Sequence, residues 1–227
     1  MRYAVTGEIL QLANVQLDER ESFRSVPGAM IYATGNISAE PVREGGILRA
    51  IGRSVSGDGL RQVQYSTVKG MGIVGLGGSA PGRILDMDVG RGRWTVARSG
   101  YLGSQPSVSL KSVYRKDAGE RTFGKEGFSL LELSGSGIAF AASCGDFSAI
   151  DLRDGEEYVV SAAHALAWHS GVGFEMGRMG KAEGDGHGRD RPYAVHLTGP
   201  GRIFIQSMSP SALAGSLSEL LGAGGGK

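Results

Sequence analysis

Apolar and polar residues alternate over short runs along most of the chain, and this period of two predicts β-strands. Residues 84–89 form a clear run, with an apolar face opposite a largely acidic one: Leu85, Met87 and Val89 against Ile84, Asp86 and Asp88. Such a strand is half-buried. The 39 glycines among 227 residues predict many tight turns between short strands, so we expect an all-β fold.

A turn pattern recurs three times: an apolar residue, two glycines separated by one residue, and an apolar run. The first glycines of the copies, Gly70, Gly135 and Gly199, are 65 and 64 residues apart. A polar turn recurs in step with it, after Leu17, Val89 and Leu152. We interpret both turns as hairpin connections. The recurrence indicates one supersecondary unit used three times.

The recurrence predicts a single β domain over residues 1–208, with units at residues 9–76, 82–140 and 148–208. In each unit an apolar stretch follows the polar turn, at residues 23–31, 94–102 and 158–168. A long polar segment then joins the two halves of the unit, at residues 41–60, 112–127 and 177–191. The last segment, Gly177–Arg191, has too few apolar residues to pack, so we expect a mobile loop there.

The C-terminal segment changes to a helical pattern. Ser209 provides an N-cap and Pro210 a first helical residue, and four leucines share one stripe: Leu213, Leu217, Leu220 and Leu221. We expect an amphipathic helix over residues 209–222 that packs on the body of its own chain, with a neighbouring subunit as the alternative partner. Residues 223–227 are expected to form a disordered tail.

Charge and hydropathy narrow the class of protein. The 24 lysine and arginine residues nearly balance the 23 aspartate and glutamate residues, so no overall field attracts nucleic acid or an anionic membrane. No apolar run reaches the length of a membrane span, and the first residues lack the apolar stretch of a signal peptide. We therefore expect a cytoplasmic protein without a membrane span.

One copy of the glycine turn, Gly70–Gly75, also matches the fingerprint of dinucleotide-binding proteins. That fingerprint requires a helix that begins inside it, because amides at the helix N-terminus hold the pyrophosphate. Residues 76–82 are rich in glycine and include Pro81, so no helix is expected there. The other two copies lack the third glycine. We therefore prefer the turn interpretation and predict no cofactor.

The histidines do not have the spacing of a metal site. His164 and His169 are five residues apart in a predicted strand, so they point to opposite faces. His196 lies in another predicted strand, and His187 lies in the polar loop, where a metal would lack the rigid scaffold that a multi-ligand site needs. We predict no metal site.

Two sets of residues are candidates for catalysis. Ser143 or Cys144 could act as a nucleophile with His164 as the base, if the fold brings these residues together. Asp86 and Asp88, on one strand face, could act as paired carboxylates. The structural alternatives are a buried, unreactive Cys144 and a solvated acidic face. The sequence favours these alternatives, so no catalytic residue and no enzymatic activity are predicted.

Three segments, in this order, resemble the family named for a mitochondrial biogenesis (altered inheritance of mitochondria) protein: Val26–Ile37, Gly127–Gly137 and Leu197–Gln206. The resemblance extends from about residue 3 to residue 221. It implies an all-β fold of the double-stranded β-helix kind, classed with the tryptophan RNA-binding attenuation protein, and often an oligomer. Mitochondrial relatives are linked to inner-membrane architecture. The family has no agreed catalytic residues, so none is assigned to this chain.

The leading hypothesis is a non-enzymatic structural or interaction protein: a double-stranded β-helix or β-sandwich-like domain of three units that forms a homo-oligomer. The alternative is a module that binds a small molecule or RNA in a cleft between repeats or subunits. RNA binding on a β-surface would need aromatic residues interleaved with basic ones. The nearest candidate is one short turn, Arg91–Trp94, so the nucleic-acid signal is weak.

Overall fold

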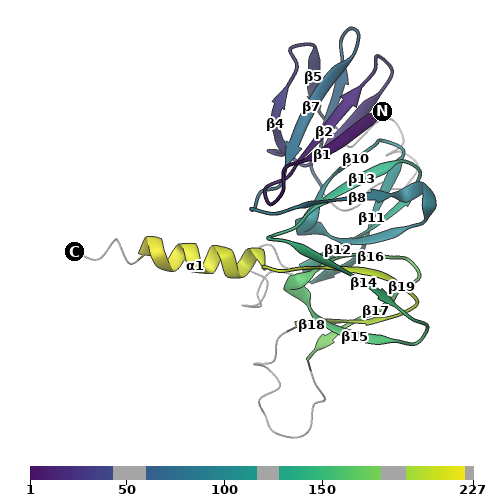
Figure 1. The fold of residues 1–227 in the computed structure, drawn as a ribbon, viewed down its shortest axis with the longest axis vertical. Coiled ribbons are helices and arrows are strands. Elements are labelled where there is room, and N and C mark those ends of the chain that lie inside the picture. The colour runs from purple at the N-terminus through teal and green to yellow at the C-terminus, as the bar shows by residue number, and fades with distance from the viewer. Residues whose placement is uncertain (43–59, 117–127, 180–192, 223–227) are drawn as a thin grey trace, which may run out of the picture.

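The computed structural model describes residues 1–42, 60–116, 128–179 and 193–222. Within these ranges strands dominate, and one α-helix, α1 (Pro210–Gly222), follows the last strand. The sheets lie one above another along the long axis of the molecule, with the N-terminal strands at one end (Figure 1). The expected all-β fold with a C-terminal helix is confirmed.

The strands form four antiparallel sheets, and within each sheet neighbouring strands are hydrogen bonded in the following order. The first sheet contains β1 (Arg2–Thr6), β2 (Leu12–Leu17), β7 (Gly72–Gly77) and β4 (Met30–Ala33). The second contains β5 (Ile37–Pro41), β6 (Val63–Thr67), β3 (Ser22–Ser25), β10 (Tyr101–Ser104), β13 (Ile138–Ala142) and β8 (Ile84–Asp88). The third contains β11 (Val108–Lys116), β12 (Phe128–Gly135), β9 (Trp94–Ala97), β16 (Ala165–His169), β19 (Gly201–Gln206) and β14 (Phe147–Leu152). The fourth contains β15 (Glu157–Ser161), β18 (Tyr193–Thr198) and β17 (Gly173–Arg178).

One strand order recurs in three segments, which we call the first unit (β2–β7), the second unit (β8–β13) and the third unit (β14–β19). In each unit the first, sixth and third strands lie side by side in one sheet; in the first unit these are β2, β7 and β4. The second, fifth and fourth strands lie side by side in the next sheet; in the first unit these are β3, β6 and β5. Neighbouring units share a sheet because the second strand of one pairs with the third strand of the next: β3 with β10, and β9 with β16.

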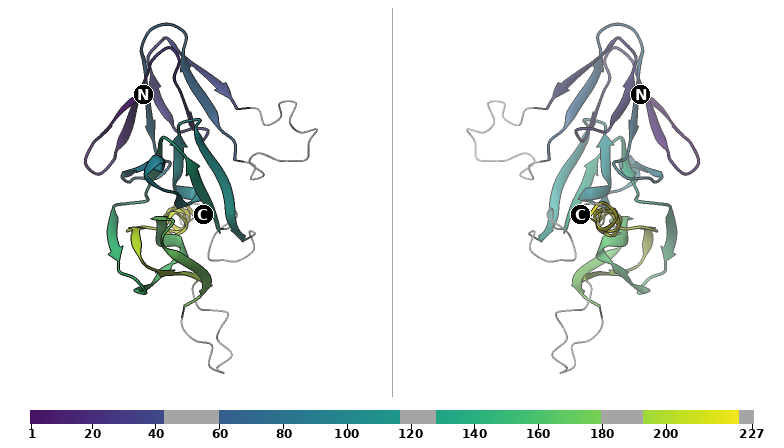
Figure 2. Two further views of the ribbon diagram at one scale, coloured as in Figure 1. Left: turned by 90° about the vertical axis from the view of Figure 1, so that its right-hand side faces the viewer. Right: turned by 90° about the vertical axis from the view of Figure 1, so that its left-hand side faces the viewer.

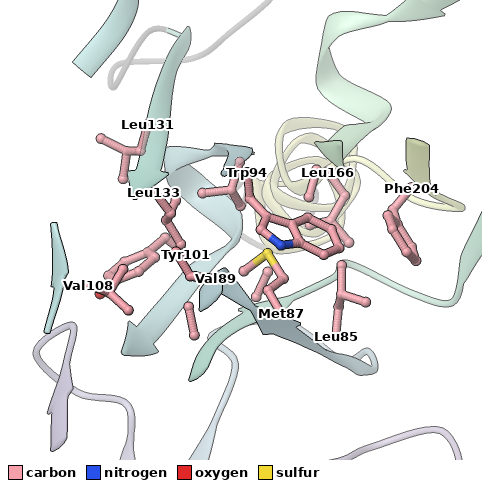
Figure 3. Packing of buried hydrophobic residues seen from close by; sticks show 14 residues of the cluster. Leu85, Met87, Val89, Trp94, Tyr101, Val108, Leu131, Leu133, Leu166 and Phe204 are labelled. Atoms are coloured by element: carbon pink, nitrogen blue, oxygen red, sulfur yellow. The ribbon is translucent and has the colours of Figure 1, made fainter. Parts of the chain in front are cut away.

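Three hydrophobic cores fill the spaces between successive sheets. The first core includes Ala13, Val15, Leu17, Phe23, Val74, Leu76, Ile84, Leu102 and Phe140. The second core includes Leu85, Met87, Trp94, Val96, Leu131, Leu133, Leu166 and Phe204 (Figure 3). The third core includes Ala97, Leu130, Leu152, Val160, Trp168, Val195, Leu197 and Ile203. The two inner sheets are therefore covered on both faces.

Strand β8 shows how this stacking changes a simple pattern. Leu85 and Met87 are buried in the second core and Asp86 is exposed, as the alternation predicts. Ile84 was expected on the solvated face with Asp86 but is only 5% exposed. The half-buried prediction is wrong at Ile84, because the first core covers that face as well.

The two recurring turns are not hairpins. The polar turn after Leu17 leads from β2 in the first sheet to β3 in the second, and the glycine turn at Gly70 leads back from β6 to β7. Hairpins form instead between the fourth and fifth strands of each unit. The prediction is wrong because strand pairing is set by the stacking of the sheets, which places β2 and β3, and likewise β6 and β7, in different sheets.

Two strand boundaries also differ from the prediction. The apolar stretch at residues 158–168 is broken between β15 and β16 by the 3-10 turn η5 (Ala162–His164), so His164 does not lie in a strand. Strand β11 continues to Lys116, into an expected loop, because it pairs with β12 over that length. Most of the three long polar segments, with His187, lies outside the described residues, as does the C-terminal tail.

Helix α1 has the predicted N-cap, since Ser209 Oγ accepts a hydrogen bond from the Ala212 N–H at 3.0 Å. None of the residues of α1 is buried, and its leucines at 217, 220 and 221 are mostly exposed. The expected packing of this helix on its own chain is wrong. The reason is its direction, because α1 leaves the side of the sheet stack and points away from it (Figures 1 and 2).

Candidate functional site

A cleft of about 340 Å³ opens between the first and second units, beside the start of α1. Most of its lining residues come from three segments, 26–29, 77–80 and 99–102, in which glycine, alanine and serine predominate. Ser143, Cys144 and Gln206 line the rest together with Pro210 and Ala142. Both candidate nucleophiles therefore lie at this cleft.

The hydroxyl of Ser143 is held by the backbone around it. Ser143 Oγ donates to the carbonyl oxygen of Gly145 at 2.6 Å and accepts from the N–H of Arg83 at 3.1 Å. The bond with Arg83 ties the residue after β13 to the residue that precedes β8, whereas the bond with Gly145 is local. The bonds that the Ser143 hydroxyl makes are therefore to backbone groups and not to a base.

The thiol of Cys144 is buried, with 2% of the residue exposed, as the sequence interpretation expected. Cys144 lies just beyond the end of β13 rather than within it. Burial raises the pKa of this thiol above its ordinary value. Because the thiolate is the nucleophile, a raised pKa makes Cys144 less reactive.

His164 does not hydrogen bond to either nucleophile. Its Nδ1 lies 2.9 Å from the carbonyl oxygen of Gln206, and the Gln206 side chain donates to the carbonyl oxygen of Ala163 at 2.9 Å. The same side chain accepts from the N–H of Cys144 at 2.9 Å. The fold thus joins Cys144 and His164 to one glutamine, which the sequence could not show, but the bonds are those of a structural network.

The two aspartates on β8 do not form a carboxylate pair. Asp86 accepts a hydrogen bond from the Tyr3 hydroxyl at 2.7 Å. Asp88 accepts from the Gly90 N–H at 3.0 Å and forms an ion pair with Arg91, also at 3.0 Å. Each carboxylate is occupied by its own partners, and this arrangement does not divide acid and base roles between them.

The other two described histidines, His169 and His196, lie in different sheets. His169 is at the end of β16, where its ring contacts the Trp94 ring with centroids 4.0 Å apart, and its pKa is lowered by partial burial and by nearby Arg202. His196 lies in β18, in the fourth sheet. Among the described residues there is no cluster of three or more histidine, cysteine or carboxylate side chains that could hold a metal ion.

The candidate RNA-binding turn does not present its aromatic ring. Trp94 is 7% exposed and belongs to the second core, and its Nε1 donates to the carbonyl oxygen of Asp88 at 3.4 Å. A base cannot stack on a ring that is packed in the core. The dinucleotide fingerprint at Gly70 fails as well, since β7 begins at Gly72 where a helix would be required.

The two ends of the sheet stack carry apolar side chains that are not covered. On β4, Met30, Ile31 and Tyr32 are 44%, 58% and 43% exposed. On β15, Tyr158 and Val159 are 37% and 45% exposed. Sequence reasoning missed these residues, because the sequence does not show that β4 and β15 lie at sheet edges.

The fold places this chain among all-β proteins built from stacked antiparallel sheets, and no helix in the described ranges is long and apolar enough to cross a membrane. Within this class, the chain belongs to the mitochondrial biogenesis AIM24 family, whose model matches residues 3–208. The family resemblance seen in the sequence is therefore confirmed.

Two streptococcal proteins are similar over nearly the whole chain. An uncharacterised protein of Streptococcus pyogenes serotype M6 is 27% identical over 234 residues, which cover 97% of this chain and 91% of the relative. A crystal structure of a Streptococcus pyogenes protein matches with a TM-score of 0.76 at 24% identity, covering 96% of this chain and 99% of that one. The structural likeness shows the fold alone.

Proposed function

We propose that this protein is non-enzymatic and acts as a structural or interaction protein by assembling into a homo-oligomeric β scaffold. The observation that carries the proposal is the uncovered apolar surface at both ends of the sheet stack, on β4 and β15. Burying such surface stabilises a contact by about 25 cal/mol per Å². Association of copies is the direct way to remove it from water.

Light scattering on the purified chain tests the assembly. We expect a molar mass of several protomers at micromolar concentration, against 23.7 kDa for one chain. A single-protomer mass over the whole range of concentrations would overturn the proposal.

The non-enzymatic part rests on the candidate nucleophiles. Ser143 is engaged by backbone groups, Cys144 is buried, and His164 bonds to Gln206. A hydrolase screen with ester substrates should find no activity. Turnover that disappears in His164→Ala while the variant stays folded would contradict this part.

The second candidate function is binding of a small molecule or an RNA segment in the cleft between the first two units. Its volume of about 340 Å³ favours a small molecule. A thermal-shift screen with nucleotides, amino acids and short RNAs tests it, because a ligand at 100 times its Kd adds about 2.7 kcal/mol of stability. No shift with any probe would remove this candidate.

A further inference from the structure

Neighbouring units within the chain are joined by one kind of contact, which occurs twice. In the pairing of β3 with β10, Gly103 lies opposite Ser25, and in the pairing of β9 with β16, Ala167 lies opposite Val96. The remaining third strand, β4, and the remaining second strand, β15, have no such partner among the described residues. The first and fourth sheets thus each expose, at one edge, one of the two strand types that form the internal junction.

The three third strands correspond residue by residue. Each carries a bulge at the same point of its pairing with the sixth strand of its unit, at Ile31 in β4, Leu102 in β10 and Leu166 in β16. The next residues therefore also correspond: Tyr32, Gly103 and Ala167.

The bulge residue enters the core of the preceding unit. Leu102 comes from the second unit but lies in the first core, and Leu166 comes from the third unit but lies in the second core. They are 2% and 0% exposed. For Ile31 there is no preceding unit among the described residues, and it is 58% exposed. Its exposure is what an unfilled junction would produce.

The sixth strand also contributes a side chain to the preceding core, next to the bulge residue. Phe140 and Phe204 lie opposite Gly103 and Ala167, and each also enters the preceding core. In the first unit Gly75 stands at this position, opposite Tyr32, whose ring occupies the space above the glycine. An aromatic ring therefore lies on the same face of the sheet in all three units. In the second and third units it comes from the sixth strand, as Phe140 and Phe204, and in the first unit it comes from Tyr32 on the third strand, β4.

The third core lacks the side chains that a following unit contributes to each of the other two cores. Leu102 and Phe140 complete the first core from the second unit, and Leu166 and Phe204 complete the second core from the third unit. Among the described residues, no following unit contributes to the third core. Beside it, Tyr158 and Val159 on β15 remain partly exposed.

Strand β4 also lacks the usual protection of a sheet edge. Exposed edges carry charges or proline, which discourage pairing with another chain. The other edge strands carry such residues: Arg2 in β1, Glu40 in β5, Asp86 in β8, Lys111 in β11, Asp151 in β14, Glu157 in β15 and Glu175 in β17. Met30–Ala33 carries none, like the internal third strand Tyr101–Ser104.

We propose that β4 of one copy pairs antiparallel with β15 of a second copy and so repeats the internal junction, an inference that rests on the proposed self-association. Ser25, Val96 and Val160 correspond, since each is a buried residue of a second strand on the face of its own core. Tyr32 then lies opposite Val160 and Ala33 opposite Val159, and Ile31 enters the third core of the second copy.

Two different surfaces meet in this contact, so it is heterologous. The first sheet of one copy and the fourth sheet of the other would form one continuous sheet, in the strand order of the second and third sheets. Each dimer keeps one free end of each kind. Addition therefore continues until a ring closes or a filament grows.

Disulfide crosslinking tests the register. Ala33→Cys and Val159→Cys are made separately in a Cys144→Ala background, mixed and oxidised. Directly opposed residues have Cα atoms about 4.5–5.5 Å apart, within reach of a disulfide. We expect a disulfide-linked dimer in the mixture. The matched control replaces Ala33→Cys with Ala149→Cys, an exposed alanine on edge strand β14 that should give no dimer.

Light scattering on the wild-type chain separates the two claims. If the wild type associates but the Ala33→Cys mixture does not crosslink, or crosslinks no better than the Ala149→Cys control, the head-to-tail contact is wrong and self-association stands. If the wild type is monomeric at every concentration, the proposed function itself is wrong. Crosslinking that is specific to the Ala33→Cys and Val159→Cys mixture supports both self-association and the head-to-tail contact.

Discussion

At the scale of single residues, the crossings between sheets depend on glycines in backbone conformations that other residues avoid. Gly135 has a φ of +103° and lies where β12 leads toward β13 in another sheet. A Cβ at this position would also run into the carbonyl oxygen of Ser107. Gly155, in the polar turn before β15, has a φ of +70° but nothing within 4 Å of its Cβ position.

Replacing each of these two glycines by alanine separates the cost of a left-handed backbone conformation from the cost of a steric clash at the new Cβ. Gly155→Ala should lower the free energy of unfolding by about 1–2 kcal/mol, the cost of a left-handed conformation. Gly135→Ala should lower it by more, because the carbonyl of Ser107 must also move. Urea unfolding of both variants measures the difference. Equal losses would mean that Gly135 is not crowded.

Tyr101 predicts how stability changes at alkaline pH. Its hydroxyl lies 2.8 Å from Ser104 Oγ and accepts from Gln62 Nε2 at 3.1 Å, and burial raises its pKa to about 12 from 10.0. In the unfolded chain the tyrosine ionises near pH 10, so its contribution is complete below pH 10 and is lost as the pH rises toward 12. Tyr101→Phe should remove that part of the decline in the free energy of unfolding. The pKa of Tyr3 is also raised to about 12, so the variant should keep the part of the decline that Tyr3 causes. A decline as steep as that of the wild type would contradict the assignment to Tyr101.

At the scale of elements, each third strand ties its unit to the one before it. Leu166 is fully buried in the second core although it belongs to the third unit. Leu166→Ala should therefore lower the free energy of unfolding by about 2–5 kcal/mol. Leu217→Ala on α1, where the leucine is 51% exposed, should change it by less than about 0.5 kcal/mol. Denaturant titration of both variants checks this, and a small loss in Leu166→Ala would argue against its role as a tie between units.

Helix α1 provides a second prediction at this scale. Because none of its residues is buried, a chain that ends at Ser209 should keep the melting temperature of the full chain. It should also keep the oligomeric state of the full chain, since the proposed contact uses β4 and β15. Calorimetry and light scattering measure both quantities. Loss of association in the shortened chain would move the interface to α1.

The limits of sequence reasoning lie at the same scale. Local signals predicted β8 from its alternation and the Ser209 cap of α1, because both depend on neighbours in the chain. They did not predict that the glycine turn at Gly70 crosses between sheets, since pairing partners are chosen by distant strands. The burial of Ile84 and the exposure of Ile31 were missed for the same reason: each depends on which unit lies next to it.

At the scale of the whole molecule, the chain is a short stack of repeating units. Repeat proteins usually close such stacks with terminal units that have a polar outer face. Here Ile31 and Tyr32 leave one end apolar, and Tyr158 and Val159 leave apolar surface at the other. Both ends therefore carry uncovered apolar surface, which is the basis of the proposed scaffold.

Mixing two variants, each blocked at one end, tests this central claim most directly. Ile31→Asp blocks the β4 end and Tyr158→Asp blocks the β15 end, and both side chains are partly exposed in the single chain, so the fold should survive. Ile9→Asp, at a 74% exposed isoleucine between β1 and β2, is the matched control and should associate like the wild type. We expect each blocked variant to be monomeric alone and their mixture to form a dimer that grows no further. Association of either blocked variant by itself, or a mixture that stays monomeric while the Ile9→Asp control associates, would contradict assembly through these two ends.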